Sequence, residues 1–231
     1  IICDKSWSFG ISSVCKKKAK EFWEQIDYLS VREQKGKEII QSIADIPVEV
    51  VADPTYLLTK EEWETLIIPG KIIKDGYIVC YFLGVDNRIQ QYARNIADKK
   101  GLRLVSILSN ECNSDDSKYA DEVLIGKTPA EFVNLIRNAE LVLTDSFHGL
   151  AFSVINKKQF LVFYRKRIDV KESRNSRIDN IVQKLGLEER LVKEPEKFAM
   201  PENCIDYQEV SLKVEDMRCK SLSFLKHALK E

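Results

Sequence analysis

The sequence predicts an α/β fold built on mainly parallel β-sheet. Short runs of β-branched and other apolar residues alternate with segments of helical periodicity over most of the chain. This alternation is typical of strands that are joined by crossover helices. With 231 residues, of which 44% are hydrophobic, the chain is long enough to bury one large core or two modest ones.

The first region, residues 1–57, is expected to form a partial N-terminal α/β lobe. Its expected elements, in chain order, are a helix over 13–25, a strand over 28–31, a helix over 33–42 and a strand over 48–51. The apolar spacing in the first helix indicates Val14, Phe22 and Ile26 as candidates for its buried face.

Residues 58–75 are expected to connect two lobes. The segment 53–58 breaks the preceding pattern, and Pro54 restricts the residue before it to extended geometry. Thr59 and Glu62 have the spacing of a capping box, which predicts that a short helix starts there. Pro69-Gly70 then marks a turn before the next apolar run.

The second region, residues 76–231, is expected to form the C-terminal lobe. Its expected elements are strands over 77–83, 103–108, 121–125, 141–144 and 159–163, and helices over 86–99, 129–138, from about 148, and 176–185. Thr128-Pro129 and Glu131 account for the start of one of these helices. Residues 207–230 carry apolar residues near helical spacing and predict a terminal amphipathic helix.

The charge balance excludes several classes of partner. Thirty-six basic residues offset thirty-six acidic ones, so no long-range field attracts nucleic acid or an anionic membrane surface. No stretch approaches the ~20 apolar residues of a transmembrane helix. We expect a chain with no nucleic-acid partner and no transmembrane segment.

The cysteine pattern favours a cytoplasmic protein. Six cysteines are scattered without a C-x-x-C pair, which is typical of reduced thiols rather than of the disulfide framework of a short secreted chain. The two histidines, His148 and His227, lie far from any cysteine pair, so a zinc site is not expected.

The segment most suited to chemistry follows the apolar run Leu141-Val142-Leu143. It reads Thr144-Asp145-Ser146-Phe147-His148-Gly149 and leads into an apolar helix. Open α/β sheets bind ligands at the carboxyl ends of their strands, where a following helix start also attracts anions. The histidine can pass a proton near neutral pH. The alternative is that Asp145 and Ser146 are ordinary helix caps and the histidine is structural.

The segment 139–153 resembles the most characteristic part of polysaccharide pyruvyl transferases, in which a T-D-S-x-H-G loop follows a strand. Further segments resemble the family in the same order, and together they cover most of residues 28–190: Ser30-Val31-Arg32-Glu33, Asp53-Pro54-Thr55, 77–84, Ser176-Arg177-Ile178 and Leu185-Gly186-Leu187.

This resemblance implies two Rossmann-like lobes similar to a B-type glycosyltransferase fold. Family members usually carry a further β/α segment with a glycine- and asparagine-rich turn in front, so the first lobe is expected to be incomplete here. The implied activity is transfer of pyruvate from phosphoenolpyruvate to two hydroxyls of a sugar as a ketal, in the biosynthesis of surface polysaccharide. The implied acceptor is a sugar or a lipid-linked glycan, and no metal or other cofactor is implied.

The resemblance also assigns roles in the loop. His148 is implied as the general acid/base, and Asp145 as the residue that orients it or the loop. Ser146 and the backbone of Gly149 are implied to hold an anionic oxygen.

Basic residues for the phosphate and the carboxylate are expected elsewhere. Arg165 follows a strand, Arg174 and Arg177 precede or open the next helix, and arginine suits both anions. A solvated basic loop would also explain each of these arginines. Arg32 is a candidate on the other lobe, although an ion pair with Glu33 or Asp53 would also explain it. Two other functions stay open: a nucleotide-sugar glycosyltransferase of the same fold, and a non-catalytic relative.

Overall fold

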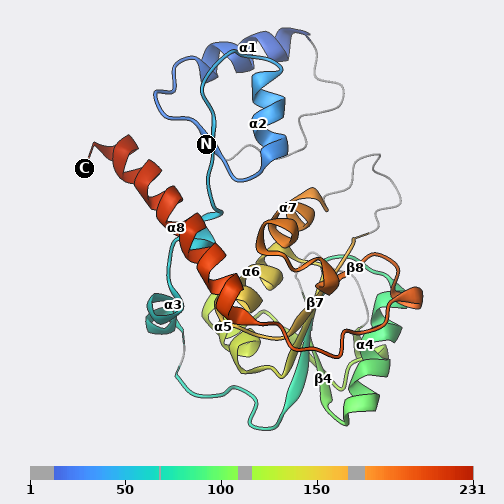
Figure 1. Cartoon of the computed structure of the whole chain (residues 1–231). Helices are drawn as coiled ribbons and strands as arrows, with labels where there is room; N and C mark the ends of the chain where they lie inside the picture. Colours follow the sequence, from blue (N-terminus) through green and yellow to red (C-terminus); the bar gives the residue numbers. More distant parts are fainter. Residues whose placement is uncertain (1–12, 68, 109–115, 166–174, 231) are drawn as a thin grey trace. The chain divides into compact units, whose positions relative to one another are not determined.

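The computed structural model describes residues 13–67, 69–108, 116–165 and 175–230 (Figure 1). The chain divides into two compact units, one formed by residues 1–57 and 209–231 and the other by residues 58–208. Each unit contains a parallel sheet. The α/β class predicted from the sequence is therefore confirmed.

The second unit is built on a six-stranded sheet with the order β5-β4-β3-β6-β7-β8, in which all neighbours are parallel. The strands are β3 (Tyr77–Tyr81), β4 (Arg103–Leu108), β5 (Glu122–Ile125), β6 (Leu141–Thr144), β7 (Phe160–Phe163) and β8 (Leu191–Val192). The chain runs outward from β3 to β5, returns to place β6 beside β3, and then runs outward in the other direction. The order of the strands therefore reverses between β3 and β6.

Helices cover both faces of this sheet. They are α4 (Asn87–Lys100), α5 (Pro129–Asn138), α6 (Phe147–Ile155) and α7 (Ser176–Leu185). Alternate residues of β3 face opposite sides: Ile78 and Cys80 share a core cluster with Ile89 of α4. Tyr77 instead donates its hydroxyl hydrogen bond to the carbonyl of Leu135 in α5, at 2.6 Å. Burial on two faces explains the nearly continuous apolar runs of these strands.

Two helix starts have the capping geometry that the sequence predicts. In α3 (Lys60–Leu66) and in α5, the threonine before the helix and the glutamate at its third position exchange hydrogen bonds with each other's backbone N–H groups. Shorter turns of 3-10 helix are η2 (Pro54–Tyr56), η3 (Asp116–Lys118), η4 (Glu188–Arg190) and η5 (Pro195–Lys197).

The first unit is smaller and holds a two-stranded parallel sheet. Its elements are α1 (Ser13–Trp23), β1 (Ser30–Val31), α2 (Gln34–Gln41) and β2 (Glu49–Val50). The helix α1 buries Ala19 and Trp23 in the core of this unit. Val14 and Phe22 are 62% and 66% exposed, so the buried face predicted for this helix was wrong for both. The apolar spacing of this helix fits two faces. The face with Ala19 and Trp23 packs against the core, and the face with Val14 and Phe22 does not.

The long helix α8 (Tyr207–Leu229) groups from Glu209 onward with the first unit. The hydroxyl of Ser221 accepts a hydrogen bond from the buried backbone N–H of Ala52 at 2.8 Å. The ring of Tyr28 makes edge contacts with Phe224 and His227. This grouping differs from the sequence-based division, which placed the helix with residues 76–231, because such contacts are invisible in helical periodicity. No helix in the described part of the chain combines the length and the apolar character that a membrane span requires.

Replacement of Ser221 tests how α8 is held. Ser221→Ala leaves the buried N–H of Ala52 without its acceptor, which should lower the free energy of unfolding by about 1–3 kcal/mol. Ser223→Ala, on an exposed position of the same helix, should change it by less than about 0.5 kcal/mol. Urea unfolding measures both values, and hydrogen exchange should show faster exchange at Ala52 in the first variant alone. Equal effects of the two changes would contradict the anchoring role.

Candidate functional site

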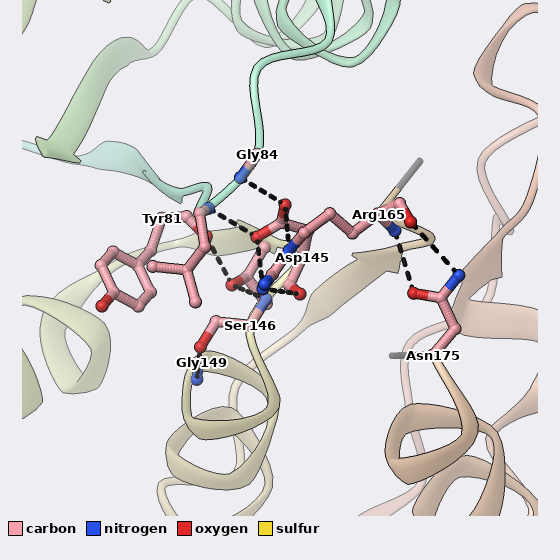
Figure 2. Close-up of polar contacts among 9 residues, drawn as sticks. Tyr81, Gly84, Asp145, Ser146, Gly149, Arg165 and Asn175 are labelled. Atoms are coloured by element: carbon pink, nitrogen blue, oxygen red, sulfur yellow. Dashed lines mark hydrogen bonds and ion pairs between the residues drawn. The ribbon is translucent and has the colours of Figure 1, made fainter. Parts of the chain in front are cut away.

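The carboxyl ends of β3, β6 and β7 lie side by side and carry the polar residues of the candidate site. β3 and β6 flank the point where the strand order reverses, and open α/β sheets bind ligands in the crevice at such a point. Leu83 and Gly84 follow β3, Asp145 and Ser146 follow β6, and Arg165 follows β7. Figure 2 shows that the polar groups of these segments converge.

The carboxylate of Asp145 connects the three strand ends. Its Oδ1 accepts a hydrogen bond from the N–H of Leu83 at 2.7 Å, and its Oδ2 accepts one from the N–H of Gly84 at 2.9 Å. The guanidinium of Arg165 donates from Nε to Oδ2 at 3.2 Å and from Nη2 to the Asp145 carbonyl at 3.1 Å. Asp145 is only 2% exposed. Asp145 therefore holds in place the loop after β3 and the side chain of Arg165.

Burial raises the pKa of the Asp145 carboxyl, and the cation of Arg165 and the two backbone N–H groups oppose this rise. The absence of a side chain at Gly84 is required for the arrangement. A Cβ atom there would lie 2.9 Å from Cγ of Arg165 and 3.1 Å from Oδ2 of Asp145. The ion pair and the tight loop are thus packed against each other.

Ser146 and Gly149 form the start of α6. The Ser146 hydroxyl accepts the N–H of Gly149 at 3.5 Å, as a helix N-cap does. Thr144 supports the same turn, since its hydroxyl donates to the carbonyl of Tyr81 at 2.7 Å and accepts the N–H of Ser146 at 3.0 Å. Gly149 is required here too, because a Cβ atom would lie 2.3 Å from Oγ1 of Thr144. Both residues expected to hold an anionic oxygen therefore help to shape the helix start.

His148 is exposed at the second position of α6. Its ring makes an edge contact with that of Phe147, with 5.6 Å between centroids. The guanidinium carbon of Arg177, in α7, lies 5.9 Å from the centroid of the Phe147 ring. The structure thus brings Arg177 to the same helix start as His148, as a cation over an aromatic face.

Arg165 is fixed at both its side chain and its backbone. Asn175, which is 7% exposed, accepts the N–H of Arg165 at 3.0 Å and donates to its carbonyl at 3.5 Å. The Arg165 side chain is 17% exposed, and within the described residues its Nη1 atom makes no hydrogen bond. Asn175 is not among the site residues predicted from the sequence, where its only signal is its place just before a predicted helix. Arg174, the other expected cation, lies outside the described residues.

Arg32 lies in the first unit and makes the ion pair that the sequence offered as its alternative role. Its Nη1 atom donates to Oδ2 of Asp53 at 2.7 Å. Burial raises the pKa of the Asp53 carboxyl, but hydrogen bonds from Thr55 and Arg32 outweigh burial and hold the pKa below its usual value. Asp53 also caps the 3-10 turn η2.

The arrangement in the second unit suits an anionic ligand and a proton transfer. Phosphate or carboxylate groups can be attracted by the guanidinium of Arg165, whose Nη1 atom makes no hydrogen bond within the described residues, and by the guanidinium of Arg177. The positive end of α6 attracts them as well. The imidazole of His148 lies exposed at the start of α6. Among the residues that the structure describes, no three side chains of types that bind metal ions gather into a site.

Comparison with known proteins identifies a family for most of the chain. The family model described as polysaccharide pyruvyl transferase matches residues 4–167, which include the strands β3 to β7 and the loop at Asp145. Among curated proteins there is no significant match.

The matched solved structures are distant in sequence and in shape. A glycosyltransferase of kitacinnamycin is 10% identical with a TM-score of 0.47; the match covers 91% of this chain and 58% of that one. A UDP-GlcNAc 2-epimerase from Methanocaldococcus jannaschii, solved with UDP-GlcNAc and UDP, is 15% identical with a TM-score of 0.46 and coverages of 83% and 54%. A glycosyltransferase from Rickettsia africae is 13% identical with a TM-score of 0.48 and coverages of 96% and 69%. The chain thus spans just over half the length of the first two.

A methyl group at Gly149 should disrupt the start of α6. We expect Gly149→Ala to lower the free energy of unfolding by about 1–3 kcal/mol, because Thr144 must move away from the new Cβ atom. The double variant Thr144→Ala/Gly149→Ala should lose at least about 0.5 kcal/mol less than the sum of the two single losses, since the residues are in contact. Urea unfolding of the four proteins measures this coupling. Strict additivity would show that the close approach is not what requires glycine.

Proposed function

Because this chain belongs to the polysaccharide pyruvyl transferase family, we propose that it transfers pyruvate from phosphoenolpyruvate to two hydroxyls of a glycan sugar, forming a cyclic ketal. The observation that carries this proposal is the fixed guanidinium of Arg165, held by the buried Asp145 beside the start of α6. Preorganised cations suit a donor that carries both a phosphate and a carboxylate.

Donor binding is assigned to the two arginines at this edge of the sheet. Arg165 would offer its open Nη1 face to one anionic group of the donor, and Arg177 would meet the other. The positive end of the α6 dipole favours anions at the same place. Asp145 acts here as a positioning residue, because both of its carboxylate oxygens accept hydrogen bonds from the protein.

The proposed reaction moves one proton to carbon and releases phosphate. His148, as an imidazolium, protonates the methylene carbon of phosphoenolpyruvate, which leaves an oxocarbenium-like centre at C2. A sugar hydroxyl adds to C2 and returns its proton to His148. The C2–O bond to phosphate then breaks, and a second hydroxyl of the sugar closes the ketal while its proton leaves with the phosphate. No metal or redox cofactor is required for this balance.

Arg32 of the first unit, whose guanidinium is held by Asp53, is proposed to bind the acceptor glycan. The acceptor is proposed to be a sugar of a surface glycan or of its lipid-linked precursor. Among the described cysteines, Cys80, Cys204 and Cys219 are free thiols, which supports the proposed cytoplasmic location.

Calorimetric titration with phosphoenolpyruvate tests the donor assignment. Saturable binding should weaken at least about tenfold in Arg165→Ala and in Arg177→Ala, because each change removes charge-assisted hydrogen bonds. Arg103→Ala is the matched control and should bind phosphoenolpyruvate as the parent does. Arg103 is exposed and lies at the amino end of β4, away from the carboxyl ends that carry the candidate site. Thermal unfolding identifies a variant that fails to fold. Tight binding of UDP or GDP sugars in place of phosphoenolpyruvate would instead indicate a glycosyltransferase.

Replacement of His148 separates catalysis from scaffolding. His148→Ala should lower the rate of acceptor-dependent phosphate release at least about a hundredfold. Its affinity for phosphoenolpyruvate and its unfolding midpoint should stay close to the parent values, because an exposed side chain buries little apolar area. Phosphate release is measured with hexose and N-acetylhexosamine oligosaccharides as acceptors. Loss of the fold in this variant would show that the histidine is structural.

A further inference from the structure

The second unit has a pocket of about 570 Å³ at the amino-terminal edge of its sheet. Residues just before four strands line it: Leu102 before β4, Glu140 before β6, Gln159 before β7 and Arg190 before β8. The candidate active site lies at the opposite edge. The four residues of β6 separate the two edges by roughly 13 Å, so a small molecule in this pocket would not contact Asp145.

The cover of the pocket is tied to its wall. Residues 200–204 line the pocket from outside the sheet. The Gln159 side-chain carbonyl accepts the N–H of Ile205 at 2.8 Å, and Nη2 of Arg190 donates to the carbonyl of Asn203. Two wall residues thereby position the covering segment, so the pocket is formed before any ligand binds.

The side chains of Gln159 and Arg190 have further hydrogen-bond donors. Within the described residues, the amide nitrogen of Gln159 and Nη1 of Arg190 make no hydrogen bond, although Arg190 is only 1% exposed. Lys100 and Glu140, also in the lining, form no ion pair in the described part of the chain. Donors and acceptors therefore remain available to a ligand.

The chemistry of the lining favours a neutral polyhydroxyl ligand. Within the lining, Lys100 and Arg190 are offset by Glu140 and Glu202, and Arg190 also pairs with Glu189 at 3.0 Å, so the pocket has no net positive charge to attract an anion. Each sugar hydroxyl both donates and accepts, which matches this mixture of groups. Apolar side chains such as that of Met200 can cover C–H groups, and the volume lies in the usual range of about 300–1,000 Å³ for ligand pockets.

We propose that this pocket binds a neutral sugar residue away from the catalytic edge of the sheet. That the sugar belongs to the acceptor glycan rests on the proposed function, whereas the binding of a neutral sugar does not. A second contact of this kind would raise the local concentration of the glycan at the enzyme without a role in the chemical step.

The two methionines of the chain provide a direct test. Met200 lines the pocket, whereas Met217 is buried in α8, in the other unit. In protein labelled with ¹³C at the methionine methyl groups, millimolar glucose, galactose, mannose or N-acetylglucosamine should shift the NMR signal of Met200 in a saturable way. The signal of Met217 should not move, and the variant Met217→Leu assigns the two signals.

Two adjacent lysines give a matched pair of variants. Lys100 and Lys99 are both exposed in the last turn of α4, but only Lys100 lines the pocket. We expect Lys100→Ala to weaken the sugar affinity by about tenfold, because a charge-assisted hydrogen bond is lost. Lys99→Ala should leave the affinity unchanged. Both should bind phosphoenolpyruvate as the parent does.

Three results would overturn the proposal: a Met200 signal that no sugar moves, equal effects of the two lysine changes, and a shift caused by inorganic phosphate rather than by sugars. Calorimetry with phosphoenolpyruvate and the Arg165 variant tests the other edge of the sheet independently. Failure of donor binding therefore does not change the outcome expected at Met200, and the two proposals can fail separately.

Discussion

The buried carboxylate of Asp145 is the interaction on which the candidate site depends. A carboxylate at 2% exposure is stable only if hydrogen bonds and an opposite charge replace its water. The loop after β3 supplies two N–H groups and Arg165 supplies the charge. The same requirement that keeps Asp145 stable therefore fixes the ends of three strands and holds the Arg165 guanidinium beside them.

This dependence explains why residues of several types surround a single ion pair. Gly84 leaves room for it, Thr144 and Ser146 complete the turn between β6 and α6, and Asn175 holds the backbone of Arg165. None of them needs to touch a substrate to matter. A cation held in place before binding loses little side-chain freedom when an anion arrives, which is the advantage of preorganisation.

The two edges of the sheet differ in charge and therefore in the ligands they suit. The carboxyl edge presents guanidinium groups and a helix start, which favour anions. The amino edge presents two cations and two carboxylates around a preformed pocket, which favours neutral hydroxyl-rich molecules. The donor with two anionic groups and the sugar acceptor that we propose would fit this division.

The sequence by itself determined the α/β class, the position of most strands and helices, and the capping of α3 and α5, because these depend on local periodicity and on side chains three residues apart. It also located the loop at Asp145. Only the tertiary structure decided which face of α1 is buried, which unit holds α8, and that Asn175 and Gly84 support Arg165. These features depend on residues far apart in the chain, whose contacts exist only after the strands align, so no local pattern records them.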